Sequence, residues 1–521
     1  MLMSSIRWRF AFTIGSNLIR GSISFITGIL LARYLGPASY GNMAFLLGTF
    51  LGIRQLLDMG SSSAFFTFLS QKPRSRRFVM SYFAWLAAQF LITLGVIGLL
   101  FPSRWIATIW HGEQRGLVLL AFTAAFMQNS IWPVIQQAGE SQRQTVWVQG
   151  ISTVVAGVHL SVVILLRKFG ILQLYAIFAA ISLEYFLAAV VAQKWHNYAK
   201  EETSGSPHIT SEPLFGKYLN YCSPLILYSC IGFAYNFADR WLLQKYGGDV
   251  EQAYYAVGSQ FSAIALIATS SILRIFWKEI AEAHHLADHA RTKTLYQKVS
   301  RHLFFGGAMI AGFFMPWAED LLRLVLGASY VGGTTTMAIM FLYPVHQSMG
   351  QIVSTMLFAT ERVSLQVTTG IIFMIASMGA TYLVLAPGNA VIPGLGLASM
   401  GLAIKMIMLQ LIQVNVLAYM IARIWKWPFD WVHQPASLLG CLGSGWIAHA
   451  AAMRMDIGAT SLPGLMGLGG GIYLLMMATF VCAMPWLAGL TRDDLISNVT
   501  NIWGKAGCRW KMGWSNTPDS K

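Results

Sequence analysis

Long apolar segments follow one another along nearly the whole chain and are separated by short polar stretches. A helix of about 20 apolar residues is long enough to cross the hydrocarbon core of a bilayer. The segments are continuously apolar and do not alternate with a period of two, so they favour helices over the strands of a membrane barrel. The pattern predicts an all-α polytopic membrane protein with about 14 transmembrane helices. The expected helices occupy residues 10–32, 40–63, 79–102, 116–137, 145–166, 170–193, 219–244, 253–276, 302–318, 334–358, 363–386, 392–421, 433–453 and 463–489.

Two similar halves are expected, because short sequences recur in the same order at a spacing of about 215 residues. The end of the first expected helix, residues 30–36, resembles residues 242–248, and a polar stretch at 194–217 follows the sixth helix. Each half has an even number of helices, so the halves share one orientation and are related by an axis along the membrane normal. The expected parts are a first six-helix bundle at 1–200, a cytoplasmic linker at 201–218, a second six-helix bundle at 219–425, two additional transmembrane helices at 426–490 and a cytoplasmic basic tail at 491–521.

Composition and charge narrow the class of protein. Apolar residues make up 55% of the 521 residues and charged residues only 11%, which excludes an ordinary soluble enzyme. The net charge is +15. With a cytoplasmic N-terminus, the inner polar segments hold about three times as many Lys and Arg residues as the outer ones. This bias predicts that both termini are cytoplasmic, and it explains the charge without a nucleic-acid partner.

A turn between the first two expected helices carries a family resemblance. Residues 31–37 read Leu-Ala-Arg-Tyr-Leu-Gly-Pro and are followed by Tyr40-Gly41. The turn resembles the one at this place in bacterial polysaccharide flippases of the multidrug/oligosaccharidyl-lipid/polysaccharide exporter (MOP) superfamily. The likeness covers residues 8–425. Its further features are the Asp239-Arg240 pair, the turn at Gly327, the loop from Ala359 to Arg362, and the glycines Gly394, Gly396 and Gly401.

This resemblance implies a fold and a function. The fold would be a V-shaped pair of six-helix bundles in the cell inner membrane. The function would be to move undecaprenyl-pyrophosphate-linked oligosaccharide repeat units from the inner to the outer leaflet by alternating access, for the export of O-antigen or an exopolysaccharide. Such a flippase is not an enzyme, needs no cofactor, and has the membrane lipid and polysaccharide polymerase machinery as expected partners. The last two helices lie outside both repeats, which leaves the subfamily open.

Several ionisable side chains fall inside the expected helices, namely Arg20, Arg54, Asp58, Glu184, Asp239, Arg240 and Lys405. A charge at the bilayer centre costs about 2.5 to 3.5 kcal/mol on insertion scales, so these residues need ion pairs, water or an anionic ligand. An arginine guanidinium offers a planar fork of donors that matches a pyrophosphate. We therefore expect Arg20 and Arg54 to line a central cavity and to bind the pyrophosphate, with Arg240 or Lys405 as supporting cations.

The acidic residues leave two roles open. A carboxylate within the membrane, Glu184 or Asp58, is a candidate site for coupling transport to a proton or sodium gradient. The alternative is charge pairing: Asp58 lies four residues after Arg54, and Glu184 could pair with Lys405 or Arg20.

The roles of the remaining acidic residue, Asp239, and of two histidines are also open. Asp239 needs a partner on another helix, because its neighbour Arg240 points in a different direction. His159 and His346 lie near the middle of expected helices, where a histidine either carries protons or forms a hydrogen bond between helices.

Uncharged polar residues also interrupt the apolar segments. They are expected to form hydrogen bonds with sugar hydroxyls if several face one cavity, and to join neighbouring helices if they do not. These residues are Asn17, Gln128, Asn129, Asn236, Gln260, Gln347, Gln351, Gln410 and Gln413.

No metal site is expected. His285 and His289 have the spacing of two ligands on one helix, but no third ligand follows at an ordinary spacing. The five cysteines include no CxxC pair, so neither a zinc site nor a disulfide framework is indicated.

Three other functions remain open. A lipid II flippase would likewise need cations within the membrane to bind its substrate. A cation-coupled multidrug antiporter of the same superfamily should have an acidic cavity, whereas the basic residues within the expected helices outnumber the acidic ones. A membrane polysaccharide polymerase or ligase needs a sizeable outer loop or acidic residues at the outer face, and the expected outer loops are short.

Overall fold

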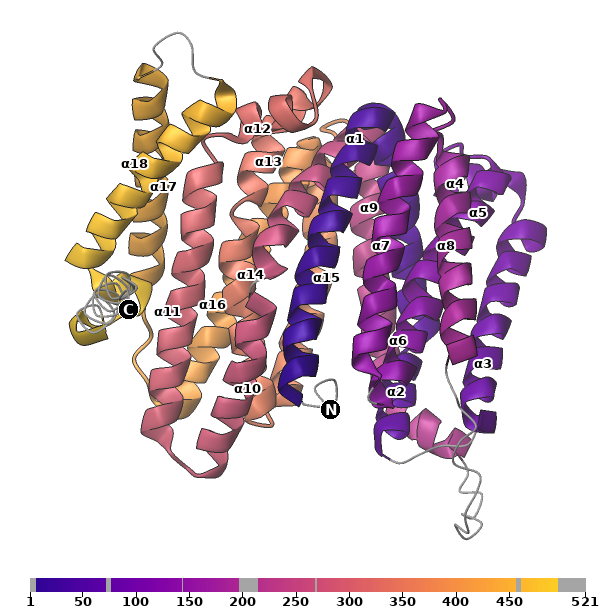
Figure 1. Ribbon diagram of the computed structural model, residues 1–521, viewed down its shortest axis with the longest axis horizontal. Coiled ribbons are helices and arrows are strands. Elements are labelled where there is room, and N and C mark those ends of the chain that lie inside the picture. Colours follow the sequence, from indigo (N-terminus) through magenta and orange to yellow (C-terminus); the bar gives the residue numbers. More distant parts are fainter. Residues whose placement is uncertain are drawn as a thin grey trace, which may run out of the picture. The chain divides into compact units, whose positions relative to one another are not determined.

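The computed structural model describes residues 6–71, 76–142, 144–195, 214–267, 269–455 and 461–494, and the regular elements in these ranges are helices (Figure 1). Nine of the helices in the described ranges are long and apolar enough to cross a membrane. This agrees with the expected all-α polytopic class. The chain divides into two compact units. Unit 1 comprises Met1–Ile267, Leu321–Met340 and Val367–Leu409, and unit 2 comprises Ala268–Asp320, Phe341–Gln366 and Gln410–Lys521.

Unit 1 contains the N-terminal helices and α9. Its α-helices are α1 (Ile6–Asp58), α2 (Ser61–Gln71), α3 (Arg76–Gly95), α4 (Ser103–Ile109), α5 (Arg115–Phe126), α6 (Trp132–Ser141), α7 (Thr145–Lys168), α8 (Leu174–Trp195), α9 (Leu214–Ile267) and α13 (Thr334–Met340). Shorter π- and 3-10 helices occupy Val96–Leu100, Met127–Ile131 and Ala328–Gly333. Three helices have residues in both units, namely α12 (Ala318–Val325), α15 (Val363–Leu385) and α16 (Ala398–Trp425).

The two longest helices each contain one glycine at which the helix is broken. In α1 the break is at Gly36 (φ 74°, ψ 168°), directly before Pro37, and in α9 it is at Gly248 (φ 78°, ψ −174°). A positive φ is accessible to glycine at little cost. The expected helices 10–32 and 40–63 therefore meet within α1, and 219–244 and 253–276 meet within α9. The two breaks fall at the ends of the sequence segments 30–36 and 242–248 that resemble each other.

α1 packs along α9 in the opposite direction, and small residues allow the close approach. At Gly41 an added Cβ would lie 1.7 Å from the backbone oxygen of Asp249. Further along, Gly48 faces the side chain of Arg240, whose Nε would be 3.1 Å from such a Cβ. The position of Arg240 therefore depends on a glycine in the facing helix.

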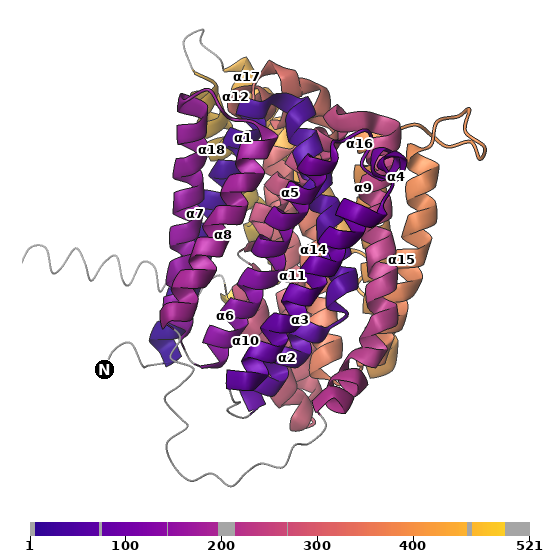
Figure 2. The ribbon, with the colours of Figure 1, turned by 90° about the vertical axis from the view of Figure 1, so that its right-hand side faces the viewer.

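The helices after α3 form the rest of the N-terminal bundle. α8 packs on both α5 and α7, and α6 packs on α7 and α8 (Figure 2). The expected helix 116–137 is made of α5, a π-helical turn at Met127–Ile131 and the first part of α6. A π-helical turn shifts the register of the side chains that follow, and such turns often occur at functional sites.

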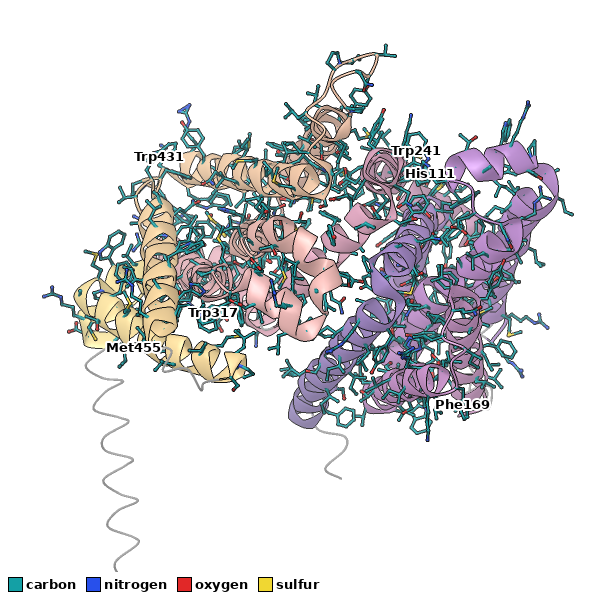
Figure 3. The ribbon with its side chains drawn as sticks, turned by 90° about the horizontal axis from the view of Figure 1, so that it is seen from above. His111, Phe169, Trp241, Trp317, Trp431 and Met455 are labelled. Atoms are coloured by element: carbon teal, nitrogen blue, oxygen red, sulfur yellow. The ribbon has the colours of Figure 1, made fainter. Side chains whose placement is uncertain are left out.

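The loop before α5 contacts α9. The ring of His111 lies 5.6 Å from that of Trp241, and the two side chains are neighbours in Figure 3. Glu113 accepts a hydrogen bond from Asn42. Burial lowers the pKa of His111, and burial also raises the pKa of Glu113 against the opposing effect of Asn42. Both shifts favour the uncharged forms of these groups at this contact.

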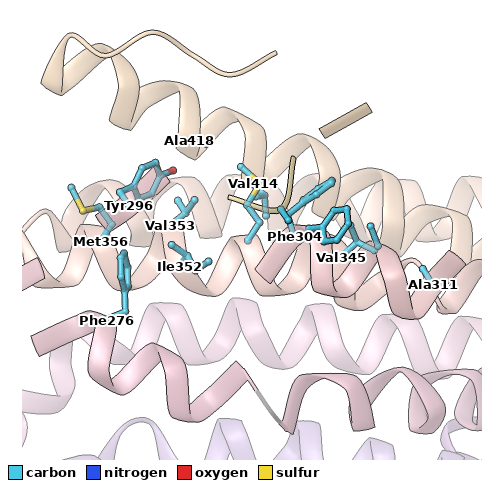
Figure 4. Close-up of a cluster of buried hydrophobic side chains, with 14 of the residues drawn as sticks. Phe276, Tyr296, Phe304, Ala311, Val345, Ile352, Val353, Met356, Val414 and Ala418 are labelled. Carbon is cyan, nitrogen blue, oxygen red and sulfur yellow. The ribbon is translucent and has the colours of Figure 1, made fainter. Parts of the chain in front are cut away.

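Unit 2 contains the C-terminal helices and its own core. Its further helices are α10 (Thr269–His285), α11 (His289–Phe314), α14 (Tyr343–Ala359), α17 (His433–Arg454), α18 (Leu462–Ala483) and a 3-10 helix at Pro485–Ala488. α11 packs on α14 and α17, and α17 packs on α18. Phe304, Ile352 and Val414 lie in a cluster of buried apolar side chains (Figure 4). The expected helix 334–358 is divided into α13 and α14, because Pro344 starts a new helix.

Candidate functional site

A cavity of about 500 Å³, here called the N-terminal polar cavity, lies inside unit 1. Its polar lining comes from α1, α6, α7, α8 and the π-helical turn, and comprises Arg20, Ser24, Thr27, Gln128, Asn129, Gln136, Ser152, His159 and Tyr185. Arg20 donates a hydrogen bond to Asn17 (2.8 Å) and is in no ion pair with any described residue. The π-helical turn carries both Gln128 and Asn129. The cavity therefore brings together Arg20 and two of the expected sugar-binding residues.

Glu184 has a partner that the sequence-based alternatives did not include. His159 Nδ1 lies 2.8 Å from Glu184 Oε2, so the carboxylate pairs with neither Arg20 nor Lys405. Glu184 is only 9% exposed, and its Oε1 is buried without a hydrogen-bond partner among the described residues. A buried carboxylate, with one oxygen unpaired among the described residues, therefore lies beside a histidine that lines the polar cavity.

A second cavity of unit 1, of about 360 Å³, is here called the arginine cavity. α1 and α9 form it, and its lining is Gly48, Leu51, Gly52, Arg54, Gln55, Asp58, Asn236 and Arg240. Within the described ranges, Arg54 forms neither an ion pair nor a hydrogen bond. Arg240 lies over the ring of Tyr255 (5.4 Å), and its Nη1 is buried without a hydrogen-bond partner.

Asp58 does not neutralise Arg54, because its carboxylate caps α2. It accepts hydrogen bonds from Ser61 Oγ (3.2 Å), from the backbone N–H of Ser62 (2.9 Å) and from Ser62 Oγ (2.9 Å). A carboxylate at this place satisfies an otherwise unpaired N–H of the first helical turn. The four-residue spacing from Arg54 therefore does not produce an ion pair.

Lys405 is paired with Asp239 inside unit 1. Lys405 Nζ donates to both oxygens of Asp239 (2.8 and 2.7 Å) and to Ser377 Oγ (3.0 Å), and Thr381 also donates to Asp239 (2.6 Å). Lys405 is only 3% exposed. Its charge is thus already compensated and hydrogen-bonded, and Arg240, the chain neighbour of Asp239, forms no ion pair with a described carboxylate.

The other expected polar residues are distributed among different surroundings. Gln260 joins α9 to α1 by accepting a hydrogen bond from Tyr40 (3.0 Å) and donating one to the backbone oxygen of Phe25 (3.1 Å). Asn236 donates to Gln55 (3.0 Å) at the wall of the arginine cavity. His346 is buried in unit 2 against Phe304.

Gln347 and Gln351 lie in unit 2 and line a third cavity, together with Gln410 and Gln413. No described group of three or more His, Cys, Asp or Glu residues is placed to hold a metal ion. His285 ends α10 and His289 begins α11, so these two histidines do not share one helix.

Sequence reasoning missed several cavity residues. Gln55, Gln136, Ser152 and Tyr185 line the two cavities of unit 1. Gln55 interrupts an apolar segment just as Arg54 does, so its polarity was a usable signal. The sequence carried no such signal for Tyr185, because an aromatic residue in an apolar segment is usually a packing residue.

The structure resembles solved transporters. A lipid II flippase MurJ in an inward closed conformation has 14% identity and a TM-score of 0.68, over 91% of this chain and 99% of that one. An inward-facing multidrug resistance MATE transporter of the MOP superfamily has 14% identity and a TM-score of 0.61, over 80% and 99% of the two chains. A MOP superfamily transporter from Pyrococcus furiosus has 13% identity and a TM-score of 0.52, over 82% and 98%. At these identities the likeness shows a common fold.

In sequence, the family described as "Polysaccharide biosynthesis protein" matches residues 9–276, which is just over half of the chain. No curated protein matches the chain. The chain therefore belongs to the polysaccharide biosynthesis protein family, and its fold is like that of these MurJ and MOP-superfamily structures.

Proposed function

We propose that this protein is a flippase that moves undecaprenyl-pyrophosphate-linked oligosaccharide repeat units across the inner membrane, for the export of O-antigen or an exopolysaccharide. The observation that carries the proposal is that Arg54 and Arg240 line one cavity and neither pairs with a carboxylate of the described residues. Nearby acidic groups have other partners: Asp58 caps α2, and Asp239 is paired with Lys405.

Unpaired cations within the membrane are energetically costly. Each arginine costs about 2.5 to 3.5 kcal/mol at the bilayer centre on insertion scales, and pairing with an anion reduces that cost. A pyrophosphate presents several acceptor oxygens to the forked donors of two guanidinium groups. An anion that arrives with the substrate would then be stabilised by two arginines that form no ion pair with a described carboxylate.

The N-terminal polar cavity supports the same function. Arg20 is available there as a further cation, and Gln128 and Asn129 offer amide donors and acceptors for sugar hydroxyls. Lys405 is left out of the proposed phosphate site because its ammonium group is bound to Asp239.

Alternating access between two six-helix halves, at 1–200 and 219–425, is the proposed mode of transport. The matching breaks at Gly36 and Gly248 support a repeated architecture. We retain about 14 spans, a V-shaped pair of bundles and cytoplasmic termini as part of this proposal. A reporter that is active only in the cytoplasm, fused after Lys521, tests the orientation of the C-terminus.

Polysaccharide polymerase machinery is the proposed partner of this flippase.

The proposed gradient sensor is the His159–Glu184 pair. We expect Glu184→Gln to retain flipping down a concentration gradient and to lose the acceleration by an imposed pH gradient, because the amide cannot take up a proton. Flipping in proteoliposomes at matched and unmatched pH measures this. Unchanged acceleration in the variant would exclude Glu184 as the coupling residue.

A lipid II flippase is the second candidate, since it also carries a pyrophosphate-linked lipid and the MurJ fold covers most of the chain. A multidrug antiporter for cationic drugs fits less well, because two arginines face one carboxylate in the arginine cavity.

The rate at which lipid-linked oligosaccharide is flipped in proteoliposomes tests the proposed function. We expect Arg54→Ala and Arg240→Ala each to reduce the rate about 10- to 100-fold, the size of one lost hydrogen bond to a charged group. Arg104→Ala, at an exposed position, is the matched control. Wild-type rates in both cavity variants, at normal protein levels, would count against the proposal. Comparing lipid II with the repeat-unit lipid as substrate distinguishes the two flippase candidates.

A further inference from the structure

Unit 2 contains a third cavity, of about 420 Å³, that the proposed phosphate site does not use. We call it the glutamine pocket. It is formed by α10, α14 and the unit 2 parts of α15 and α16. Its lining is Leu273, Trp277, Gln347, Gly350, Gln351, Ser354, Thr355, Phe358, Gln366, Gln410, Gln413, Val414 and Leu417. Val414 belongs to the buried apolar cluster in Figure 4, so the pocket lies directly against the core of this unit.

Glutamine side chains with unused hydrogen-bonding capacity surround this pocket. Gln347, Gln366, Gln410 and Gln413 form no side-chain hydrogen bond with any described residue. The Oε1 atom of Gln366 is buried without a partner. Each amide offers two donor hydrogens and an acceptor oxygen, and a buried amide without partners is costly. The four glutamines are partly buried, so the pocket suits an occupant with many hydroxyl oxygens.

The backbone leaves space for one of these amides. At Gly350 an added Cβ would lie only 2.9 Å from Gln410 Nε2. A larger residue at 350 would push the amide away, so the glycine allows Gln410 to reach the pocket.

An aromatic pair completes the lining. The rings of Trp277 and Phe358 are stacked, with centroids 5.8 Å apart and an angle of 9° between the planes. Trp277 is 46% exposed, so part of its ring is accessible. No charged residue is present in the described lining. A flat apolar ring beside several amides matches a pyranose, which has an apolar C–H face and a rim of hydroxyl groups.

We propose that the glutamine pocket binds a neutral sugar residue of the lipid-linked oligosaccharide. The inference rests on the proposed function and names the substrate class that this pocket selects. An acyl chain would leave the amides unpaired, and an acidic sugar would find no cation in the described lining. A neutral sugar satisfies the amides and can pack its C–H face against the part of Trp277 that lines the pocket.

The test compares two probes on the full-length protein in nanodiscs: undecaprenyl pyrophosphate, and the same lipid carrying an oligosaccharide of neutral hexoses. We expect the wild type to bind the glycosylated probe more tightly. Gln410→Leu and Gln413→Leu should each reduce that preference roughly 2- to 10-fold, the effect of one lost hydrogen bond. Binding of undecaprenyl pyrophosphate should stay within about twofold, because the arginine cavity is untouched.

Two comparisons separate sugar binding from a structural role. Trp277→Leu should lose the preference for the glycosylated probe, whereas Trp277→Phe should retain most of it. The melting temperatures of Gln410→Leu and Gln413→Leu should equal or exceed that of the wild type, because neither amide bonds to a described residue. Gln297→Leu makes the same chemical change elsewhere in unit 2 and serves as the control.

The outcomes are distinguishable. If the wild type prefers the glycosylated probe and the glutamine variants keep the full preference, the pocket holds water only and the inference is overturned. If the glutamine variants melt at lower temperatures and bind both probes more weakly, the glutamines are structural and the inference is again overturned. If the wild type binds neither probe, the proposed function itself fails.

Discussion

Asp239 and Arg240 are neighbours in the chain and have different roles in the structure. Successive residues of a helix point about 100° apart, so the two side chains meet different surroundings. Asp239 is buried with Lys405, Ser377 and Thr381, whereas Arg240 lies at the arginine cavity. One member of the pair therefore contributes to the internal structure of unit 1, and the other is available to a ligand.

Removal of Lys405 should test this assignment. Lys405→Met leaves the buried carboxylate of Asp239 without its cation, and breaking such a pair typically costs about 3 to 5 kcal/mol. We expect a large fall in the unfolding midpoint in detergent. The double variant Asp239→Asn with Lys405→Met should recover most of the stability, because no uncompensated charge remains. A phosphate-binding role for Lys405 would instead lower transport without lowering the stability of the single variant.

At the scale of elements, the contact between α1 and α9 is the main packing interaction that positions the arginine cavity. Both helices contribute to the lining, with Arg54 on α1 and Arg240 on α9. The helices approach so closely at Gly41 that its Cα faces the backbone of Asp249. The separation of the two arginines is thus set by contacts between backbones.

A methyl group at Gly41 should force the two helices apart. Gly41→Ala places a Cβ at 1.7 Å from a backbone oxygen, which cannot move as a side chain can. We expect a loss of about 1 to 3 kcal/mol, as for other overpacked sites, together with reduced flipping.

Gly15→Ala is the matched control for this prediction, since it lies in the same helix with no atom within 4 Å of the added Cβ. Its stability should equal or slightly exceed that of the wild type, because alanine favours helices. Thermal unfolding of the two variants measures the difference. Equal stability of both would show that α1 and α9 separate without cost.

At the scale of the whole molecule, the sequence was sufficient for the class of fold. Continuous apolar segments identified membrane helices, and the glycine-proline turn at Gly36 marked the place where α1 is broken. Helix ends were less accurate, because polar segments continue some helices beyond the apolar stretch. α11 begins at His289, well before the expected start at 302.

Side-chain partners could not be predicted in the same way. Lys405 and Asp239 are 166 residues apart, and their contact depends on how the helices are rotated about their axes. Apolar sequence alone does not specify that rotation. The same limit applies to Glu184, which could have met several cations and meets His159. The sequence therefore identified the charged residues within the expected helices, but it did not predict which of them pair.

The imbalance of charge in the arginine cavity has a consequence for the membrane voltage. Two guanidinium groups against one carboxylate leave an empty cavity positive, whereas the pyrophosphate of the proposed substrate would make it negative. A potential of 100 mV contributes about 2.3 kcal/mol for each elementary charge carried across the membrane. With a negative cytoplasm, this electrical work favours outward movement of the loaded cavity and inward return of the empty one. A potassium diffusion potential imposed with valinomycin should accordingly accelerate export in one polarity and slow it in the other.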